Sequence, residues 1–490
     1  MVKFLVTGVL FLLVELGLFL LSANECWAQS RVRTVDFSFV PEKSDDPYNQ
    51  RIKQNTLAVG AAGFVLLAKK SGNTYSVGYY DLDLKKIWET TLPLTNLEEV
   101  EAFTRNDEQV LVLTHKQDKE AGSQTLTGYR IDLKTGKQTE AIKLAEAPAK
   151  SRRIGVSYSA DGSKLVIYAY QYQQAQLKEI KASLFDGNLT KIKDQTYNLN
   201  DLVGTQSATI KIDNDGNQYV ALITNNATKL SIRRYSNTAP AVKGMDIQVG
   251  GVFEGRKVYL FDSFFELQQD GSLYAAVMCA DEKTGDFYSL KVIKFDFSAG
   301  DMKFAPEFRF TPQYIADINK LNKTGASAVK RLEDIYLSEI VVSPEKNVLV
   351  LAEKKYNEGP KLPFAAREIH LFTYDEYLNP TWHSVVNKSQ SAPATEGFTS
   401  ISYKAHLINE ELHLVTLETQ NGKKDLYSRK INIKSGNTAP AKPLGLNLAT
   451  DQQTAYLKDF TTWLDDKTMV ALVRPAKKGK GLQLSKITFR

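Results

Sequence analysis

The stretch that decides the fold is a hairpin, Tyr158-Ser-Ala-Asp-Gly-Ser-Lys-Leu-Val-Ile-Tyr168, in which Asp-Gly separates two runs of strand-forming residues. The pattern recurs as Ile212-Asp-Asn-Asp-Gly-Asn-Gln-Tyr-Val-Ala221 and Leu267-Gln-Gln-Asp-Gly-Ser-Leu-Tyr-Ala-Ala276. Asp-Gly is typical of tight hairpins in which both central residues take positive φ. Degenerate copies of the turn are Ala62-Gly63, Asn106-Asp107, Glu345-Lys346, Asn409-Glu410 and Asp465-Asp466. The chain therefore contains eight copies of one hairpin.

A third strand follows the hairpins, and its closing turn repeats in two forms. In the first form an Asp has Leu three residues later, as at Asp81, Asp186 and Asp375, and the residues seven positions later are Trp88, Lys193 and Trp382. In the second form Asp or Asn has Gly four residues later, as at Asp132, Asp296 and Asn432. Each turn leads into a fourth strand. The pattern predicts an all-β fold, a β-propeller of four-stranded blades, with eight blades favoured and seven as the alternative.

The two ends of the chain predict how the ring closes. The eighth unit has three strands, and the chain stops after the third, Leu482 to Phe489. A spare strand, Val32 to Val40, precedes the first unit. We expect this N-terminal strand to complete the last blade, because an unpaired sheet edge is otherwise left open. The prediction is one propeller domain over residues 29–490.

Residues 1–28 resemble a secretory signal peptide. Lys3 precedes an apolar run from Phe4 to Leu21, and small residues stand at the −3 and −1 positions of a cut before Gln29. The alternative is an uncleaved membrane anchor, which Glu15 in the middle of the run disfavours. The sequence therefore predicts export to the periplasm or outside the cell, with no membrane span after cleavage.

Composition limits the classes of function. Hydrophobic residues make up 43% of the 490, which excludes a disordered chain. A net charge of +6 is too small over this length to bind polyanions by itself, so we expect no nucleic-acid partner. After cleavage only Cys279 remains, within an apolar run, and we expect it to be buried and unreactive.

Two families show similar repeats. Ser159-Ala-Asp-Gly162 before an apolar strand, and Ser343-Pro-Glu-Lys346 before Val348, resemble repeats of the periplasmic TolB-type propellers. The Asp-x-x-x-Gly turns resemble the quinoprotein-like repeat, which also occurs in a non-enzymatic, eight-bladed outer-membrane assembly scaffold. The resemblance implies architecture, since fold does not carry function with it. The adjacent cysteine pair of the quinoprotein enzymes is absent, and we expect no cofactor.

Catalytic and metal-binding motifs are missing from the sequence. There is no Gly-x-Ser-x-Gly elbow, no phosphate-binding glycine loop and no Cys-x-x-Cys or His-x-x-x-His pair. If Asn409-Glu410 is a two-residue turn, His406 pairs directly with His413 on one face of the hairpin. Two imidazoles could hold Zn²⁺ or Cu²⁺, but no third ligand is nearby in sequence, so no metal site is predicted.

Two long insertions predict where a partner would bind. The first, residues 311–336 between blades, contains a stretch from Pro312 that is typical of a short helix and includes Tyr314. The second, residues 354–367 between the second and third strands of blade six, carries Tyr356, Lys361, Phe364 and Arg367. Both leave the ring on the same face. Long loops on a rigid scaffold are where binding residues concentrate, so these five residues are the predicted partner-binding set.

The favoured hypothesis is an exported, monomeric binding scaffold that presents this face to a protein or another cell-envelope component. The alternative is a propeller enzyme, a hydrolase or lyase acting on a glycan or peptide at the central channel. Enzymes of this shape converge titratable groups from several blades on the channel, an arrangement that sequence alone does not reveal. Ligand sensing is the third and least favoured hypothesis.

Overall fold

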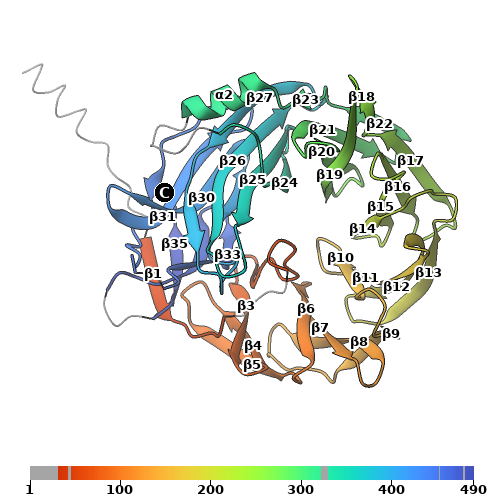
Figure 1. Ribbon diagram of the computed structural model, residues 1–490. Helices are drawn as coiled ribbons and strands as arrows, with labels where there is room; N and C mark the ends of the chain where they lie inside the picture. Colours follow the sequence, from red (N-terminus) through yellow and green to blue (C-terminus); the bar gives the residue numbers. More distant parts are fainter. Residues whose placement is uncertain (1–30, 42–45, 322–328, 452, 478–480, 490) are drawn as a thin grey trace, which may run out of the picture.

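Eight antiparallel sheets form a closed ring around a central channel (Figure 1). The computed structural model describes residues 31–41, 46–321, 329–451, 453–477 and 481–489. The predicted eight-bladed β-propeller is confirmed, and the seven-bladed alternative is excluded. Within these residues no helix is both long and apolar enough to cross a membrane. The predicted signal peptide, residues 1–28, lies outside the described part of the chain.

The first four blades are regular four-stranded sheets. Blade 1 comprises β2 (Thr56–Ala58), β3 (Phe64–Ser71), β4 (Thr74–Tyr80) and β5 (Lys86–Pro93). Blade 2 comprises β6 (Glu98–Arg105), β7 (Gln109–Asp118), β8 (Ser123–Asp132) and β9 (Ile142–Pro148). Blade 3 comprises β10 (Gly155–Tyr158), β11 (Lys164–Gln173), β12 (Gln176–Asp186) and β13 (Lys191–Asn198). Blade 4 comprises β14 (Ser207–Ile212), β15 (Gln218–Thr224), β16 (Lys229–Tyr235) and β17 (Val242–Gln248).

Blades 5 and 6 carry extra strands, and a helix lies between them in the chain. Blade 5 comprises β18 (Gly251–Phe253), β19 (Arg256–Leu267), β20 (Leu273–Asp281), β21 (Phe287–Asp296), β22 (Asp301–Phe304) and β23 (Phe308–Arg309). The helix α2 (Pro312–Leu321) follows, as predicted. Blade 6 comprises β24 (Ile335–Val342), β25 (Val348–Asn357), β26 (Phe364–Tyr374), β27 (Pro380–Val386) and β28 (Gln390–Ala392).

Blade 7 comprises β29 (Tyr403–Ile408), β30 (Glu411–Gln420), β31 (Lys423–Asn432) and β32 (Lys442–Pro443).

Blade 8 joins the two ends of the chain. It contains β33 (Tyr456–Asp465), β34 (Thr468–Val473) and β35 (Gln483–Thr488), and its fourth strand is β1 (Arg31–Asp36). β1 runs antiparallel to β35, with Arg31 opposite Thr488 and Asp36 opposite Gln483. The predicted closure by the N-terminal strand is confirmed, and the strand is shorter than the predicted span 32–40.

The Asp-Gly hairpins differ in detail from the predicted turn. Gly162 and Gly216 have φ values of 68° and 86°, but the preceding aspartates are not among the residues with positive φ. The N–H of Gly162 donates to the carbonyl of Ser159 at 3.0 Å, which makes a four-residue turn with glycine in the left-handed position. The Asp161 carboxylate accepts the N–H of Ser163 at 2.9 Å and so stabilises its own right-handed backbone. The expected positive φ at both central residues is therefore wrong here.

Neighbouring blades are joined by a repeated hydrogen bond. A side chain of one blade donates to a backbone carbonyl of the next blade. The acceptor follows the Asp that opens the turn between the third and fourth strands, or the residue in the equivalent position. The tryptophans of the sequence motif do this, Trp88 to Leu133 at 3.0 Å and Trp382 to Ile433 at 2.8 Å. The same carbonyl position is reached from Lys486, Gln109, Lys193 and Lys243, at the interfaces of blades 8 and 1, 2 and 3, 3 and 4, and 4 and 5.

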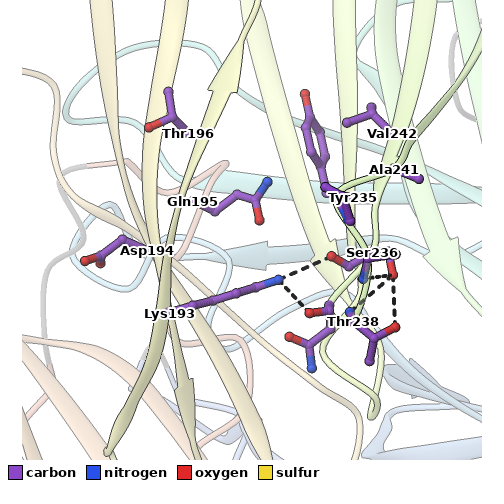
Figure 2. A pocket seen from close by; sticks show the side chains of 12 residues that line it. Lys193, Asp194, Gln195, Thr196, Tyr235, Ser236, Thr238, Ala241 and Val242 are labelled. Carbon is purple, nitrogen blue, oxygen red and sulfur yellow. Dashed lines mark hydrogen bonds between the residues drawn. The ribbon is translucent and has the colours of Figure 1, made fainter.

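The two forms of the turn after the third strand pack against each other: the tryptophan that follows the first form lies on the glycine of the second form in the next blade. Gly136 has a φ of 71°, and a Cβ added there would lie 2.7 Å from the Trp88 ring, so the tryptophan packs directly on the glycine backbone. Between blades 3 and 4 Lys193 replaces the tryptophan and reaches the carbonyls of Ser236 and Asn237 at 3.2 and 2.8 Å (Figure 2). A cavity of about 410 Å³ remains beside it. We interpret this cavity as the space that the missing indole leaves.

Strand direction divides the ring into two faces. The first-to-second-strand hairpins and the third-to-fourth-strand turns lie together on one side, which we call the hairpin face. The second-to-third-strand turns and the connections between blades lie on the other, the loop face. Between the faces, apolar side chains of adjacent blades interdigitate, as where Leu66 of blade 1 packs in one cluster with Leu472 of blade 8.

Candidate functional site on the loop face

Exposed apolar side chains gather on the loop face. Of the large apolar side chains exposed in the described residues, one lies in a hairpin-face turn, Tyr377, which is 62% exposed. Four lie in loop-face connections, spread around the ring: Val40, Leu97, Val203 and Leu362. Two more, Tyr172 and Val252, lie on strands at this face, and three, Ile87, Ile192 and Val242, lie at the hairpin-face starts of outer strands. The remainder lie elsewhere on strands. Exposed apolar groups on one face of a rigid scaffold indicate a surface that other molecules contact.

The segment between β1 and β2 crosses the mouth of the channel on this face. In Figure 1 the red-brown chain that precedes β2 reaches the centre of the ring. Arg51 pairs with Glu99 of blade 2 at 2.6 Å, and Arg153 pairs with Glu99 and Glu101 at 3.2 and 2.7 Å. On the opposite side, the Tyr48 ring lies 5.1 Å from the Phe398 ring. Residues 46–55 are thus anchored to blades on opposite sides of the channel.

Hydrogen bonds fix the last residues of this segment against blades 7 and 8. Gln54 donates to the carbonyl of Thr461 at 2.9 Å and accepts from Lys404 Nζ at 2.5 Å. The backbone N–H of Asn55 donates to the carbonyl of Asp459 at 2.7 Å. A cavity of about 180 Å³ lies beside residues 39–41 and 46–55 and is bordered by Arg51, Asn55 and Asp459. The segment therefore forms one wall of the channel mouth.

Lysines and carboxylates from blades 5 to 8 and from the crossing segment face each other in the channel. Burial, reinforced by the charges of other lysines, lowers the pKa of Lys53 and of Lys355, and it lowers the pKa of Lys404 to about 8. Burial raises the pKa of the four carboxyl groups nearby, Asp262, Glu266, Glu339 and Asp459. The channel is a poorly solvated, highly charged site, an arrangement that occurs more often at functional sites than elsewhere.

Burial brings the pKa values of Glu339 and Lys404 close to neutral pH. Burial, together with the negative charge of Glu266, raises the pKa of Glu339 to about 7, against an opposing effect of Lys404. Both groups therefore change charge near neutral pH. A carboxyl and an amine with such pKa values can exchange protons with a ligand at physiological pH.

The second predicted insertion is mostly strand, and the structure brings two of its residues, Tyr356 and Arg367, together. β25 continues to Asn357 and β26 begins at Phe364, so the turn itself is residues 358–363. Lys361 is exposed on this turn. The half-buried Arg367 guanidinium lies 3.4 Å from the Tyr356 hydroxyl, and its centre is 6.0 Å from that ring. These three residues remain available to a partner on the loop face.

Tyr314 and Phe364 are buried. The Tyr314 hydroxyl lies 2.7 Å from Nδ1 of His370, and the ring packs between blades 5 and 6. Burial lowers the pKa of His370 to about 3, so this imidazole is neutral. Phe364 contacts Phe398 with ring centroids 4.9 Å apart. These two side chains stabilise α2 and the connection to blade 7 from inside, and they are not part of the exposed surface.

The histidine pair has the predicted register and a packing role. His406 is directly opposite His413, as expected. His406 stacks on Trp463 at 4.8 Å, and His413 meets the edge of the same indole at 5.5 Å. Among the residues that the structure describes, no three His, Cys, Asp or Glu side chains are grouped to hold a metal. Cys279 is fully buried, and burial raises the pKa of its thiol to about 11.

Sequence reasoning missed the channel groups and the crossing segment. Residues 46–55 contain no repeat and no motif, and the channel lysines occupy positions of their strands that look like ordinary alternation. A weak signal was present for Lys404, which stands near the start of the first strand of its blade, where side chains line the channel of a propeller. The meeting of the channel groups in space depends on closure of the whole ring.

The likenesses to known proteins are distant. No protein-family model and no curated protein sequence matches the chain. Among solved structures, the WD40 domain of SCAP from fission yeast matches with a TM-score of 0.42 and 7% identity, over 94% of this chain and 98% of that one. The polysaccharide lyase Uly1 matches with a TM-score of 0.40 and 9% identity, over 79% and 89%. The β-propeller domain of the Trilobed protease from Pyrococcus furiosus matches with a TM-score of 0.36 and 11% identity, over 80% and 94%. Such distant likenesses carry no argument about function.

Proposed function

We propose that this chain is an exported binding propeller that docks a protein or another cell-envelope component on its loop face. The observation that carries the proposal is the distribution of exposed apolar side chains outside the strands, four in loop-face connections against one in a hairpin-face turn. The hairpin face consists of short turns that close on themselves and on the next blade. The loop face has room for variation because its connections are longer.

The surface around the blade 6 turn supports the proposal in more detail. Leu362 is 47% exposed beside the exposed Lys361, and the Tyr356–Arg367 pair adds an aromatic ring under a guanidinium. Aromatic and arginine side chains are the types most enriched at the centres of protein interfaces. The rigid strands β25 and β26 hold this surface in place, so binding would not require the scaffold to rearrange.

Cross-linking from the two faces tests the proposal. A photoreactive residue at Leu362 or Val252 should cross-link an envelope component in the native cell, and one at Tyr377 should not. The paired change Lys361→Glu with Leu362→Asp should abolish the Val252 cross-link, while Tyr377→Asp should leave it intact. Folding of each variant is checked by its thermal unfolding curve. Cross-links that form equally well from Tyr377, or that survive the paired change, would contradict docking on the loop face.

Export is the part of the proposal that depends on residues 1–28. The apolar run and the small residues before Gln29 support it. The intact mass of the protein recovered from outside the inner membrane should correspond to a chain that begins at Gln29. A product that keeps Met1 and stays in the membrane fraction would overturn this assignment.

One observation favours a second candidate, an enzyme acting on a glycan or peptide in the channel. Glu339, with a pKa of about 7, lies within electrostatic reach of Lys404, with a pKa of about 8. Such a pair has the charges needed for general acid–base chemistry. Gln54 occupies a hydrogen-bonding position on the Lys404 ammonium, which places the crossing segment between this pair and the loop face. We therefore rank binding above catalysis.

A further inference from the structure

Two adjacent arginines in the connection between blades 2 and 3 have opposite surroundings. Arg153 pairs with the carboxylates of Glu99 and Glu101 at 3.2 and 2.7 Å. Within the part of the chain that the structure describes, no carboxylate oxygen lies within 4.0 Å of the Arg152 guanidinium, the limit that defines an ion pair. Arg152 is exposed on the loop face, and an arginine keeps its charge at physiological pH. Its charge is therefore available to a molecule that contacts this face.

Tyrosines of β11 hold the Arg152 side chain in place. The centre of the guanidinium lies 4.6 Å from the centroid of the Tyr170 ring, and Nη1 donates to the Tyr172 hydroxyl at 2.7 Å. The Tyr168 ring meets the Tyr170 ring edge-on, with centroids 5.4 Å apart. The Tyr170 hydroxyl donates to the carbonyl of Ala208 in blade 4 at 3.0 Å, which fixes this ring. The guanidinium is thus stacked on a fixed aromatic surface.

The backbone of Arg152 is fixed by Gln124, a buried side chain of β8. Gln124 Nε2 donates to the carbonyl of Arg152 at 3.2 Å and to the carbonyl of Pro148 at 3.1 Å. Gln124 Oε1 accepts the backbone N–H of Ile154 at 3.1 Å. One amide therefore bonds both ends of the connection. A side chain that is already held loses little conformational entropy when it binds a partner, and this favours affinity.

Most of the hydrogen-bonding capacity of the Arg152 guanidinium is unused. A guanidinium has five N–H donors in a planar fork. Among the described residues, its one side-chain hydrogen bond is that from Nη1 to Tyr172. A carboxylate fits such a fork with two parallel hydrogen bonds, and a bidentate pair is stronger and more selective than a single contact. The arrangement therefore suits a carboxylate.

Exposed apolar side chains lie on the same part of the loop face. Tyr172 is 42% exposed, and Val203, in the connection between blades 3 and 4, is 73% exposed. Tyr172 is paired with Leu177 across the β11–β12 hairpin. The N–H of Leu177 donates at 3.2 Å to the carbonyl of Thr205, two residues beyond Val203. Arginine and tyrosine beside exposed apolar groups are typical of the centres of protein interfaces.

We propose that Arg152 binds an acidic side chain of a protein partner, while Tyr172 and Val203 contact an apolar residue next to it. This inference rests on the proposed docking on the loop face, and it adds the chemistry of the partner and a contact area on blades 2 to 4. A protein segment fits better than an acidic glycan because Val203 offers apolar contact and no side-chain hydrogen bond to a sugar.

Selection from a random peptide library displayed on phage tests this chemistry. Wild-type protein should enrich peptides that carry Asp or Glu next to an apolar residue, and Arg152→Gln should lose them. Lys150→Gln is the matched control, because it removes the same charge from an exposed side chain of the same connection, and it should keep them. Enriched peptides without an acidic residue, or the same peptides enriched by Arg152→Gln, would overturn the proposal.

A double-mutant cycle then locates the contact. One selected acidic peptide, and its variant with glutamine in place of the acidic residue, are titrated by calorimetry onto wild type and Arg152→Gln. Each single change should weaken binding about tenfold or more, and both together should weaken it no further, because they remove the same pair. Arg152→Lys keeps the charge without the fork and should bind about fivefold more weakly than wild type. Additive losses would place the acidic residue elsewhere and overturn the assignment.

Two further measurements separate this contact from folding and from a glycan partner. Arg152 is exposed, so Arg152→Gln should leave the melting temperature unchanged. Polygalacturonate serves as an acidic polysaccharide probe and should not be retained by the wild-type protein. Retention of polygalacturonate that is lost in Arg152→Gln, with no acidic peptide selected, would identify a glycan partner and overturn the protein partner.

Cross-linking in the native cell separates this inference from the proposed docking. A photoreactive residue at Val203 should cross-link a protein, and Arg152→Gln should abolish that cross-link. If Leu362 and Val252 cross-link while the Val203 cross-link is absent or survives Arg152→Gln, this inference fails and the proposed docking stands. If none of the three positions cross-links, docking on the loop face fails, and this inference fails with it.

Discussion

The two faces of this propeller are built from the same strands and differ in what their connections do. On the hairpin face, turn carboxylates accept backbone N–H groups, as Asp132 does from Thr135 at 2.7 Å, and side chains of the preceding blade bond the adjacent carbonyls. On the loop face, the connections carry exposed apolar groups, a helix and the segment that crosses the channel. One face holds the ring together, and the other is free to acquire binding residues.

The largest expected effect comes from deleting β1, the strand that closes the ring. A chain that begins at Phe37 lacks β1, so it loses six residue pairs with β35 and exposes the edge of blade 8. We expect a loss of about 4 kcal/mol or more in the free energy of unfolding, measured by urea titration. The matched control is a chain that begins at Arg31. Identical unfolding of the two chains would show that closure does not stabilise the ring.

A smaller effect is expected from replacing side chains that join neighbouring blades near the hairpin face. Trp382→Ala removes an indole that donates to Ile433 and packs on Gly436, and it should cost about 3 kcal/mol in stability. Lys193→Ala removes two hydrogen bonds at the equivalent place and should cost about 1 kcal/mol. Both values come from urea unfolding. If the lysine variant were the less stable of the two, the tryptophan and glycine forms would not be the stronger joints.

An effect of opposite sign is expected in the channel. The folded pKa of Glu339, about 7, is above that of an unfolded glutamate, so folding favours its protonated form. Stability from this group is full at acidic pH and is lost as the pH rises toward and past 7. Glu339→Gln keeps the neutral form and should therefore stabilise the protein by up to about 2 kcal/mol near pH 8.5, with little change near pH 5.

Thermal unfolding at both pH values measures the Glu339 effect. Glu358→Gln, an exposed change on the same blade, serves as the control and should alter neither value. A Glu339→Gln variant that is less stable at the higher pH would mean that the ionised carboxylate is needed by the lysines around it. In that case ionised Glu339 would stabilise the fold, as the turn carboxylates of the hairpin face do.

Much of the architecture could be predicted because it is encoded over short distances in the chain. An Asp-Gly turn depends on the conformations of a few adjacent residues, so counting such turns gave eight blades. The missing strand of the last unit and the spare strand at the other end gave the closure. The helix from Pro312 was predicted from its own sequence in the same way. The turn geometry was wrong because the aspartate side chain bonds its own backbone, a detail that composition does not reveal.

The candidate site could be predicted only in part. Lys361, Tyr356 and Arg367 lie at the predicted face, since a turn between strands must be at one end of a blade. Tyr314 and Phe364 are buried because α2 and the connection to blade 7 fold back onto the sheets, and an amphipathic residue in an insertion gives no sign of which side it will take.

What the sequence by itself determined was the repeat, and hence the number of blades, the order of their strands and the partner that completes the ring. Only the tertiary structure decided that residues 46–55 cross the channel and that Gln54 accepts a hydrogen bond from Lys404 Nζ. These residues are hundreds of positions apart in the chain, and no local preference links them. They become neighbours because closing the ring brings the inner strands of all blades around one axis.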